Sequence, residues 1–403
     1  MTSAAPAPEA ESRAGRILVL VGIVVLAFNL RPSAVSVGPV LDEVRGGLGM
    51  SDTEAGILTS LPVLAFALFG GLAPRVARRV GAHRLTLVAL LAVVVGLYSR
   101  SKVDGVLPFL ALTLLALAGM ASANVVIPSL VKLHFPTRVG LVTSIYSTAL
   151  AVGLTSASVL TVPISEQYDG WRSGLEAWAL LAAVAVVPWL FLVRHDRPDA
   201  LATPGESIGL GRVARTRLGW YMALFFGLQS LQAYAVFGWM ADVYRSAGFS
   251  AHDAGLLLGA VTGISIPLSF VIPSLAARMT DISRLVWALF ICYPIGYGGL
   301  ILAPRGGAWV WAVVIGIGLC MFPLVLTLIG LRARTPAGTA ALSGFTQSVG
   351  YLLSVVGPFG VGVLHQASGG WTVPLLALTA ASVPLLVVAL AVSRPAYLED
   401  QLT

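Results

Sequence analysis

Long apolar runs recur along the whole chain, separated by short polar segments. A run of about 20 residues, at the α-helical rise of 1.5 Å per residue, crosses the roughly 30 Å hydrocarbon core of a bilayer. The pattern predicts twelve membrane-spanning helices, at residues 16–40, 53–77, 85–99, 106–131, 139–163, 175–193, 218–243, 254–277, 285–303, 308–331, 339–364 and 373–392. The expected fold class is therefore an all-α integral membrane protein.

The composition excludes a water-soluble domain, because 57% of the residues are hydrophobic and only 11% are charged. The polar segment 194–217 divides the predicted helices into two sets of six, at residues 16–193 and 218–393. The tails 1–15 and 394–403 are polar, and we expect the first to be disordered. The longest segment between helices is too short for a catalytic domain. We therefore expect no enzyme activity, no catalytic residues, no metal site and no cofactor.

The two cysteines, Cys292 and Cys320, lie inside apolar runs, where we expect buried and inert thiols. Basic residues set the orientation: of the 25 Lys and Arg, 18 lie in the two tails, the central segment and the other loops on the same side. Because cytoplasmic loops carry the excess of Lys and Arg, both termini and segment 194–217 are expected in the cytoplasm. The net charge of +7 then reflects topology, and no nucleic-acid partner is needed.

The two halves repeat short patterns at a nearly constant offset. Gly49-Met50-Ser51 returns as Gly248-Phe249-Ser250 after 199 residues, and Gly170-Trp171 returns as Gly370-Trp371 after 200. Because six is an even number of crossings, both halves enter the membrane in the same direction. The sequence thus predicts two parallel six-helix repeats. Known folds with such repeats enclose a central cavity, with the substrate site between the halves near the midplane, and this resemblance implies the same arrangement here.

One charged side chain lies deep in a predicted helix. Arg31 follows Arg16 by fifteen residues, which places it roughly 22 Å along the first helix. A charge at that depth costs about 2.5–3.5 kcal/mol on insertion scales, so it must face protein, water or an anion. The forked guanidinium suits a carboxylate or a small linear or planar anion. Arg31 is the predicted substrate anchor.

Sequence motifs extend across both halves. They are Asn29-Leu30-Arg31-Pro32, Phe135-Pro136-Thr137-Arg138, Gly170-Trp171-Arg172, Gln229-Ser230-Leu231, Phe322-Pro323-Leu324, Leu342-Ser343-Gly344-Phe345 and Gly357-Pro358. In these motifs the chain resembles the major facilitator superfamily, and within it the cyanate permease and nitroimidazole transporter family. The resemblance implies a secondary transporter that works by alternating access in the cytoplasmic (inner) membrane. It also implies a monomer that moves a small anionic or planar polar solute, with protons as a possible partner.

The same resemblance suggests which residues move the helices. The superfamily signature between the second and third helices matches at Arg79, Gly81 and Arg84, whereas Arg78 stands where an acid is usual and Pro74 where a glycine is usual. This loop latches the cytoplasmic side in the superfamily. The residues expected to act in gating are Arg75, Arg79, Gly81, Arg84, Arg138, Arg278, Arg332 and Pro358.

Further substrate contacts follow from helical spacing. Gln229 and Gln232 are three apart and share a face, which we expect opposite Arg31. Ser343, Gln347 and Tyr351 form a polar stripe in the eleventh helix, which must face protein or water. Four weaker candidates complete the predicted site: Asn29, Asn124, Tyr146 and, from the resemblance alone, Tyr234. For each of these, helix packing is the competing interpretation.

Coupling and substrate class stay open in the sequence. All 18 acids lie in tails, in loops or near helix ends, with Glu176 the most inward. This pattern is compatible with three modes of transport: proton coupling through such a peripheral group, a substrate that carries its own proton, and uncoupled transport. The family analogy favours a proton-linked symport. A multidrug or metabolite exporter is the alternative function, although a lone cavity cation disfavours cationic drugs. A membrane receptor or enzyme is a remote third.

Overall fold

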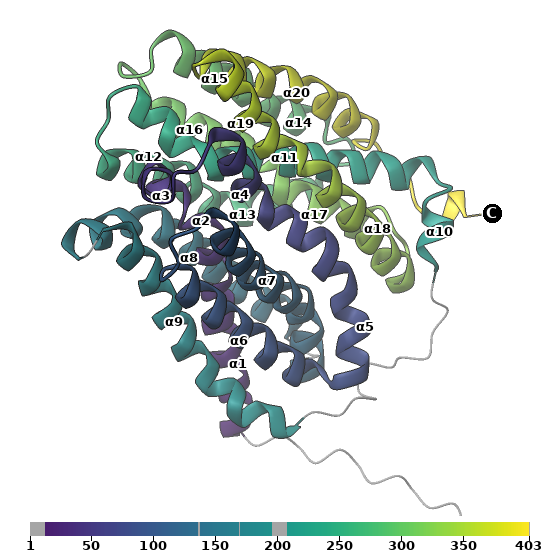
Figure 1. The fold of residues 1–403 in the computed structure, drawn as a ribbon. Helices are drawn as coiled ribbons and strands as arrows, with labels where there is room; N and C mark the ends of the chain where they lie inside the picture. The colour runs from purple at the N-terminus through teal and green to yellow at the C-terminus, as the bar shows by residue number, and fades with distance from the viewer. Residues whose placement is uncertain (1–12, 136–137, 169, 196–207, 403) are drawn as a thin grey trace, which may run out of the picture.

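The computed structural model describes residues 13–135, 138–168, 170–195 and 208–402. Within these residues every regular element is helical, and the elements assemble into two bundles (Figure 1). Eleven segments are long and apolar enough to cross a membrane. A further helix, α11, has 30 residues and lies at the predicted seventh crossing. The prediction of an all-α membrane protein is confirmed.

The first bundle holds the helices before residue 195. They are α1 (Arg13–Leu30), α2 (Pro32–Val35), η1 (Gly38–Val40), α3 (Leu41–Leu48), α4 (Asp52–Ala65), η2 (Phe66–Gly70), α5 (Gly71–Val80), α6 (Ala82–Arg100), α7 (Val106–His134), α8 (Val139–Gln167), α9 (Trp171–Leu192) and η3 (Val193–His195). Small residues allow close helix packing here: a Cβ on Gly119 of α7 would overlap the backbone of Ala89 in α6.

The second bundle begins after the linker helix α10 (Leu210–Val213). Its helices are α11 (Arg217–Ser246), α12 (Ala251–Gly263), α13 (Ser265–Arg278), α14 (Ser283–Phe290), α15 (Cys292–Leu302), α16 (Ala308–Leu319), α17 (Met321–Leu331), α18 (Pro336–Ser354), α19 (Val356–Ser368), α20 (Thr372–Ala391) and η5 (Glu399–Gln401). Helix α11 lies against α18, α19 and α20, so it forms the centre of this bundle.

Several crossings are broken near their middle. The first crossing breaks between α1 and α2, where Pro32 lacks the N–H that would continue the helix and Arg31 takes the position before it. The second crossing passes through a π-helical turn, η2, after Pro62. The eleventh crossing breaks between α18 and α19 at Val355. These breaks fall where the two bundles face each other.

The repeat seen in the sequence has a structural counterpart. Gly49 and Gly248 both have positive φ, at 66° and 93°, which only glycine adopts without strain. Each precedes a helix that a serine caps: Ser51 accepts a hydrogen bond from the Glu54 backbone N–H, and Ser250 accepts one from that of Asp253. The same turn therefore begins the second crossing of each half.

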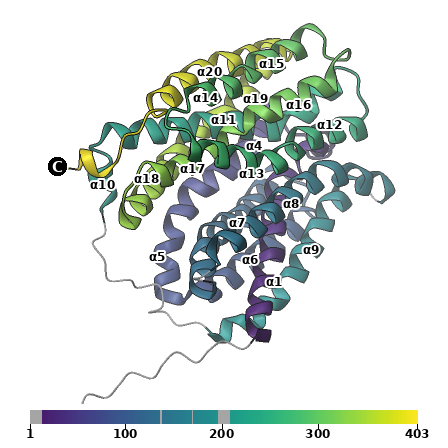
Figure 2. The ribbon, with the colours of Figure 1, turned by 180° about the vertical axis from the view of Figure 1, so that it is seen from behind.

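The bundles meet at one end and diverge at the other. We use inner end for the end that carries residue 13 and residue 402, and outer end for the opposite one. In the outer half, α4 packs on α19 and α8 packs on α12 across the bundle interface. At the inner end α5 and α18 diverge (Figures 1 and 2). The structure is thus closed at the outer end, and its bundles are separated at the inner end.

Candidate functional site

Arg31 lies at the break of the first crossing, facing the second bundle. Its guanidinium interacts with the hydroxyl of Tyr234 in α11, which interacts in turn with Tyr351 in α18. The Arg31 side chain is half-buried, and no carboxylate of the described residues lies within ion-pair distance of it. Within the part of the chain that the structure describes, a cation at the seam of the two bundles is therefore left without a counter-ion.

Aromatic rings from both bundles surround this cation. Phe66 of η2 stacks on Tyr351, with 4.6 Å between ring centroids and 13° between planes. Tyr351 also meets Phe226 edge-on at 4.8 Å and Tyr234 at 6.4 Å. Because Phe66 belongs to the first bundle and the other rings to the second, the cluster forms an aromatic wall that joins the two bundles beside Arg31.

A small cavity of about 20 Å³ lies next to this wall, toward the outer end. Ser33, Thr59 and Thr113 of the first bundle and Tyr234 and Phe237 of the second are among its lining residues. The hydroxyls of Ser33 and Thr113 are buried and have no hydrogen-bond partner among the described residues. The cavity therefore has polar groups that a ligand or a water molecule can satisfy.

The polar stripe of the eleventh crossing lies on α18. Gln347 donates from Nε2 to the Ser343 hydroxyl over 2.7 Å, and both side chains are half-buried. Tyr351, further outward on the same helix, belongs to the aromatic wall. The stripe thus leads from the inner half of α18 to the Arg31 cluster, as a cavity lining requires. Ser348, also on α18, lies 3.8 Å from the position of a Cβ built on Gly71 in the first bundle.

The structure corrects the predicted position of the paired glutamines. Gln229 donates to the Leu319 carbonyl over 3.3 Å, and Gln232 donates to the Leu378 carbonyl over 2.7 Å and accepts from the Tyr297 hydroxyl over 2.8 Å. Both side chains are fully buried inside the second bundle. They do share a face, but that face packs on α15, α16 and α20. Tyr234, which helical spacing did not favour, is the residue of α11 beside Arg31.

The remaining candidates differ in how far they are engaged. Asn29 is buried and donates to the Val25 carbonyl of its own helix over 2.8 Å, while its Oδ1 has no partner. Asn124 on α7 and Tyr146 on α8 are half-buried. Among the described residues, no hydrogen bond joins either of them to Arg31. Their predicted role in binding stays a prediction.

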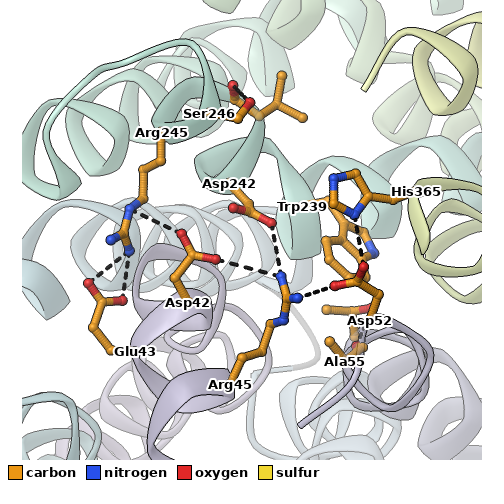
Figure 3. A network of polar contacts seen from close by, with 12 residues as sticks. Asp42, Glu43, Arg45, Asp52, Ala55, Trp239, Asp242, Arg245, Ser246 and His365 are labelled. Carbon is orange, nitrogen blue, oxygen red and sulfur yellow. Dashed lines mark hydrogen bonds and ion pairs between the residues drawn. The ribbon is translucent and has the colours of Figure 1, made fainter. Parts of the chain in front are cut away.

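A charge network joins the bundles at the outer end (Figure 3). Arg245 of α11 donates from Nη1 to both oxygens of Glu43, over 2.8 and 2.7 Å, and its Nε lies 3.3 Å from Asp42. Arg45 of α3 lies 3.7 Å from both Asp42 and Asp242, and it pairs with Asp52, which also contacts His365 of α19 at 3.3 Å. Each arginine binds acids across the interface, so the network holds the outer end closed.

Close backbone contacts accompany these charges. A Cβ added to Gly56 in α4 would lie 3.2 Å from the Phe359 carbonyl oxygen, and one on Gly362 would lie 2.8 Å from the Asp52 carbonyl oxygen. A Cβ on Gly38 would overlap the Phe237 carbonyl. Glycines thus let the two bundles approach to backbone distance in the outer half.

The residues predicted to act in gating lie at or near helix ends, except Arg75 in the middle of α5 and Pro358. Gly81 lies between α5 and α6 and has a φ of 98°. The exposed arginines of this set are Arg79, Arg84, Arg138 and Arg278. The side chain of Arg75 is not among those that the structure describes. Pro358 lies in α19, and its carbonyl accepts from Trp239 over 2.9 Å. Arg332 is buried and donates to the carbonyls of Val392 and Ser393, which ties the end of α20 to α17.

Sequence profiles and relatives agree with this architecture. The profile of the Major Facilitator Superfamily matches residues 18–358. An uncharacterized transporter YycB of Bacillus subtilis is 37% identical over 90% of both chains. The 2-nitroimidazole transporter of Escherichia coli is 33% identical over 94% of this chain and 96% of its own. The cyanate transport protein CynX of the same organism is 30% identical over 88% and 91%.

A solved structure shares the fold. The nucleoside transporter NupG superposes with a TM-score of 0.74 at 14% identity, over 94% of this chain and 98% of its own. With two parallel six-helix bundles and a site at their seam, the chain is a membrane transporter and not an enzyme. It belongs to the Major Facilitator Superfamily, and within that to the family of the 2-nitroimidazole and cyanate transporters.

Proposed function

We propose that the protein moves a small anionic or planar polar solute across the cytoplasmic membrane by alternating access, with Arg31 as the anchor. The observation that carries the proposal is the Arg31 guanidinium at the bundle seam, without a carboxylate partner among the described residues and beside Tyr234 and Tyr351. A guanidinium offers forked donors to a carboxylate or a linear anion, and tyrosine hydroxyls add neutral donors.

The names of two relatives support this class of solute, since one carries cyanate and the other 2-nitroimidazole. Cyanate is a small linear anion. A nitroimidazole is planar, which suits the stacked rings of Phe66 and Tyr351. Both solutes can accept hydrogen bonds from Arg31, so one site of this chemistry serves either.

The proposal includes an orientation. The excess of Lys and Arg at the inner end supports a cytoplasmic location for both termini. The structure then corresponds to a state open to the cytoplasm and closed to the outside. The outer charge network and the glycine contacts form the closed gate. Separation of the same surfaces, together with approach of α5 and α18, gives the opposite state. We propose that the chain carries out this cycle as a monomer.

Uptake into proteoliposomes tests the proposal. Labelled cyanate and a labelled 2-nitroimidazole are offered with and without an inward proton gradient. We expect transport of at least one of them, and a dependence on the gradient if coupling is proton-linked. Arg31→Ala should abolish uptake at unchanged expression, and Arg31→Lys should retain little because the fork is lost. Wild-type rates in Arg31→Ala would remove Arg31 from the site.

A further inference from the structure

Arg100, the last residue of α6, is a fully buried cation near the outer end. Its side chain is 0% exposed, and its guanidinium carbon lies 6.0 Å from the centre of the Phe109 ring. Nη2 donates to the Ser36 hydroxyl over 3.1 Å, whereas Nε and Nη1 have no hydrogen-bond partner. A buried charge without a partner costs several kcal/mol. Among the described residues, this arginine therefore has no negatively charged partner that would offset the cost of its burial.

The acids nearest in sequence are already used. Arg172 of α9 pairs with Asp104 over 2.6 Å and donates to two loop carbonyls. Lys102 pairs with Glu176 over 2.6 Å. Both of these cations are more exposed than Arg100, yet they hold the acids of this end. Within the described chain, no carboxylate pairs with Arg100.

Two further unpaired donors lie one helical turn inward. The hydroxyls of Ser33 and Thr113 line the 20 Å³ cavity and have no hydrogen-bond partner. Ser36, which contacts Arg100, follows Ser33 by three residues, and Phe109 precedes Thr113 by four. Residues at these spacings lie on one side of a helix. Arg100 is therefore held by the same two segments that supply the unpaired hydroxyls.

The second bundle forms the lid of this cavity. Tyr234, Phe237 and Gly238 of α11 complete its lining. In the outer-closed state its volume suffices for about one water molecule. When the bundles part at the outer end, α11 moves away from α2 and α7. The hydroxyls then face the widened space, with Arg100 on their outer side and Arg31 on their inner side.

We propose that Arg100, Ser33 and Thr113 form a second anion subsite, outward of Arg31, which binds the negatively charged group of the solute when the outer end is open. The ligand class is a small monovalent anion or a carboxylate, because every unsatisfied group here can donate a hydrogen bond. Ser36 orients the guanidinium. The solute is held first at this outer subsite and then at Arg31. This inference rests on the proposed function of the seam.

The kinetic test compares KM for solute offered from the outer and the inner side of oriented vesicles. Thr113→Val removes one hydroxyl at constant shape and should raise the outer KM about tenfold, as expected for one hydrogen bond to a charged group. Arg100→Gln should raise the outer KM further, and Arg100→Lys should have an outer KM between those of the wild type and Arg100→Gln. The inner KM should change less. Thr86→Val is the matched control, since its buried hydroxyl only bonds to the Ala82 carbonyl of its own helix. A wild-type outer KM in both Thr113→Val and Arg100→Gln would overturn the subsite.

A binding test separates the subsite from the transport function. The Arg245→Gln variant, which lacks the cross-bundle ion pairs of Arg245 with Asp42 and Glu43, is combined with Arg31→Ala to remove the inner anchor. Potassium cyanate, nitrate and acetate are then titrated at constant ionic strength against potassium sulfate. We expect anion-dependent thermal stabilisation in this variant and its loss when Arg100→Gln is added. Equal stabilisation with and without Arg100 would refute the subsite, even if the wild type transports cyanate. Stabilisation that depends on Arg100 would support it, even if neither solute is transported.

Discussion

The closed outer end depends on charges that come from both bundles, and Arg245 is the arginine whose acid partners all lie in the opposite bundle. Its Nη1 donates to both oxygens of Glu43, and its Nε lies 3.3 Å from Asp42 (Figure 3). Both acids belong to the first bundle, so these contacts exist only while the outer end is closed. Arg245→Gln should therefore shift the equilibrium toward the outward-open state.

The size of the shift follows from the contacts. Hydrogen bonds to charged groups contribute about 1.5–3 kcal/mol when buried, and exposed ion pairs contribute about 0.2–1 kcal/mol. Arg245 and Glu43 are 24% and 36% exposed, so the pair lies between these limits. We expect about 1–2 kcal/mol, which changes the ratio of closed to open molecules by about 5- to 30-fold. Without the Arg245 charge, Arg45 is the one arginine of the described residues left beside Asp42, Asp52 and Asp242. The repulsion among these three carboxylates then opposes the closed state further.

Distances between spin labels measure this shift directly. Gln167 and Gly306 are exposed at the outer ends of the first and second bundles, and each is replaced by a labelled cysteine after Cys292→Ser and Cys320→Ala. We expect a longer outer distance to gain population in Arg245→Gln. Arg172→Gln is the control, because its partner Asp104 belongs to its own bundle. Identical distance distributions in wild type and Arg245→Gln would refute the assigned role of the network.

Three further predictions concern affinity, packing and pH. Gln347→Ala should weaken apparent substrate affinity by about two- to tenfold, as expected for the loss of one neutral hydrogen bond, with little change in melting temperature. If the substrate stabilises this variant as much as the wild type, α18 does not line the cavity. Gly96→Val should destabilise the folded protein by about 1–3 kcal/mol, because even a Cβ would lie 2.6 Å from the Ala116 N and the Leu112 O. Gly298→Ala is the control, since its Cβ meets open space and should not destabilise the protein. Equal melting temperatures of the two variants would contradict this packing. Hydrogen bonds from the Arg334 and Thr335 backbone N–H groups lower the pKa of Glu399 to about 2, so its stabilisation of the C-terminal tail is complete above pH 4.5 and is lost as the pH falls toward 2. Proteolysis of the tail should become faster over that pH range, and it should also be faster in Glu399→Gln at neutral pH. A proteolysis rate that does not depend on pH would refute the tether.

Much of the fold follows from the sequence alone. Apolar runs locate the crossings because the bilayer fixes their length, and Pro32 marks the break that precedes α2. The repeat at Ser51 and Ser250 is real, since both residues cap the second helix of their half. The depth of Arg31 in its run also locates a cation at the seam. These features depend on local sequence and on the thickness of the membrane.

The parts that sequence could not give depend on which face of a helix meets which neighbour. Spacing shows that Gln229 and Gln232 share a face, but both faces of α11 contact protein, and the glutamines lie on the face turned to their own bundle. Arg100 stands at the end of a run, where an interfacial arginine is the ordinary interpretation. Its burial arises from Ser36 and Phe109, which belong to other helices.

The charge network at the outer end could not be predicted from the sequence for the same reason. Asp42 in α3 and Arg245 at the end of α11 are about 200 residues apart, and neither helix alone indicates a partner. The repeat does give one indication, because it places these two segments at equivalent positions of the two halves and hence at the same end of the molecule.

The most direct test of the account is equilibrium binding of potassium cyanate, and of a 2-nitroimidazole, to the purified protein and to its Arg31→Ala and Arg31→Lys variants. We predict that binding of at least one ligand is measurable in the wild type, weakens at least tenfold in Arg31→Lys and is lost in Arg31→Ala, with all three proteins equally folded. Wild-type affinity in the folded Arg31→Ala protein would contradict the claim that this unpaired guanidinium anchors the solute.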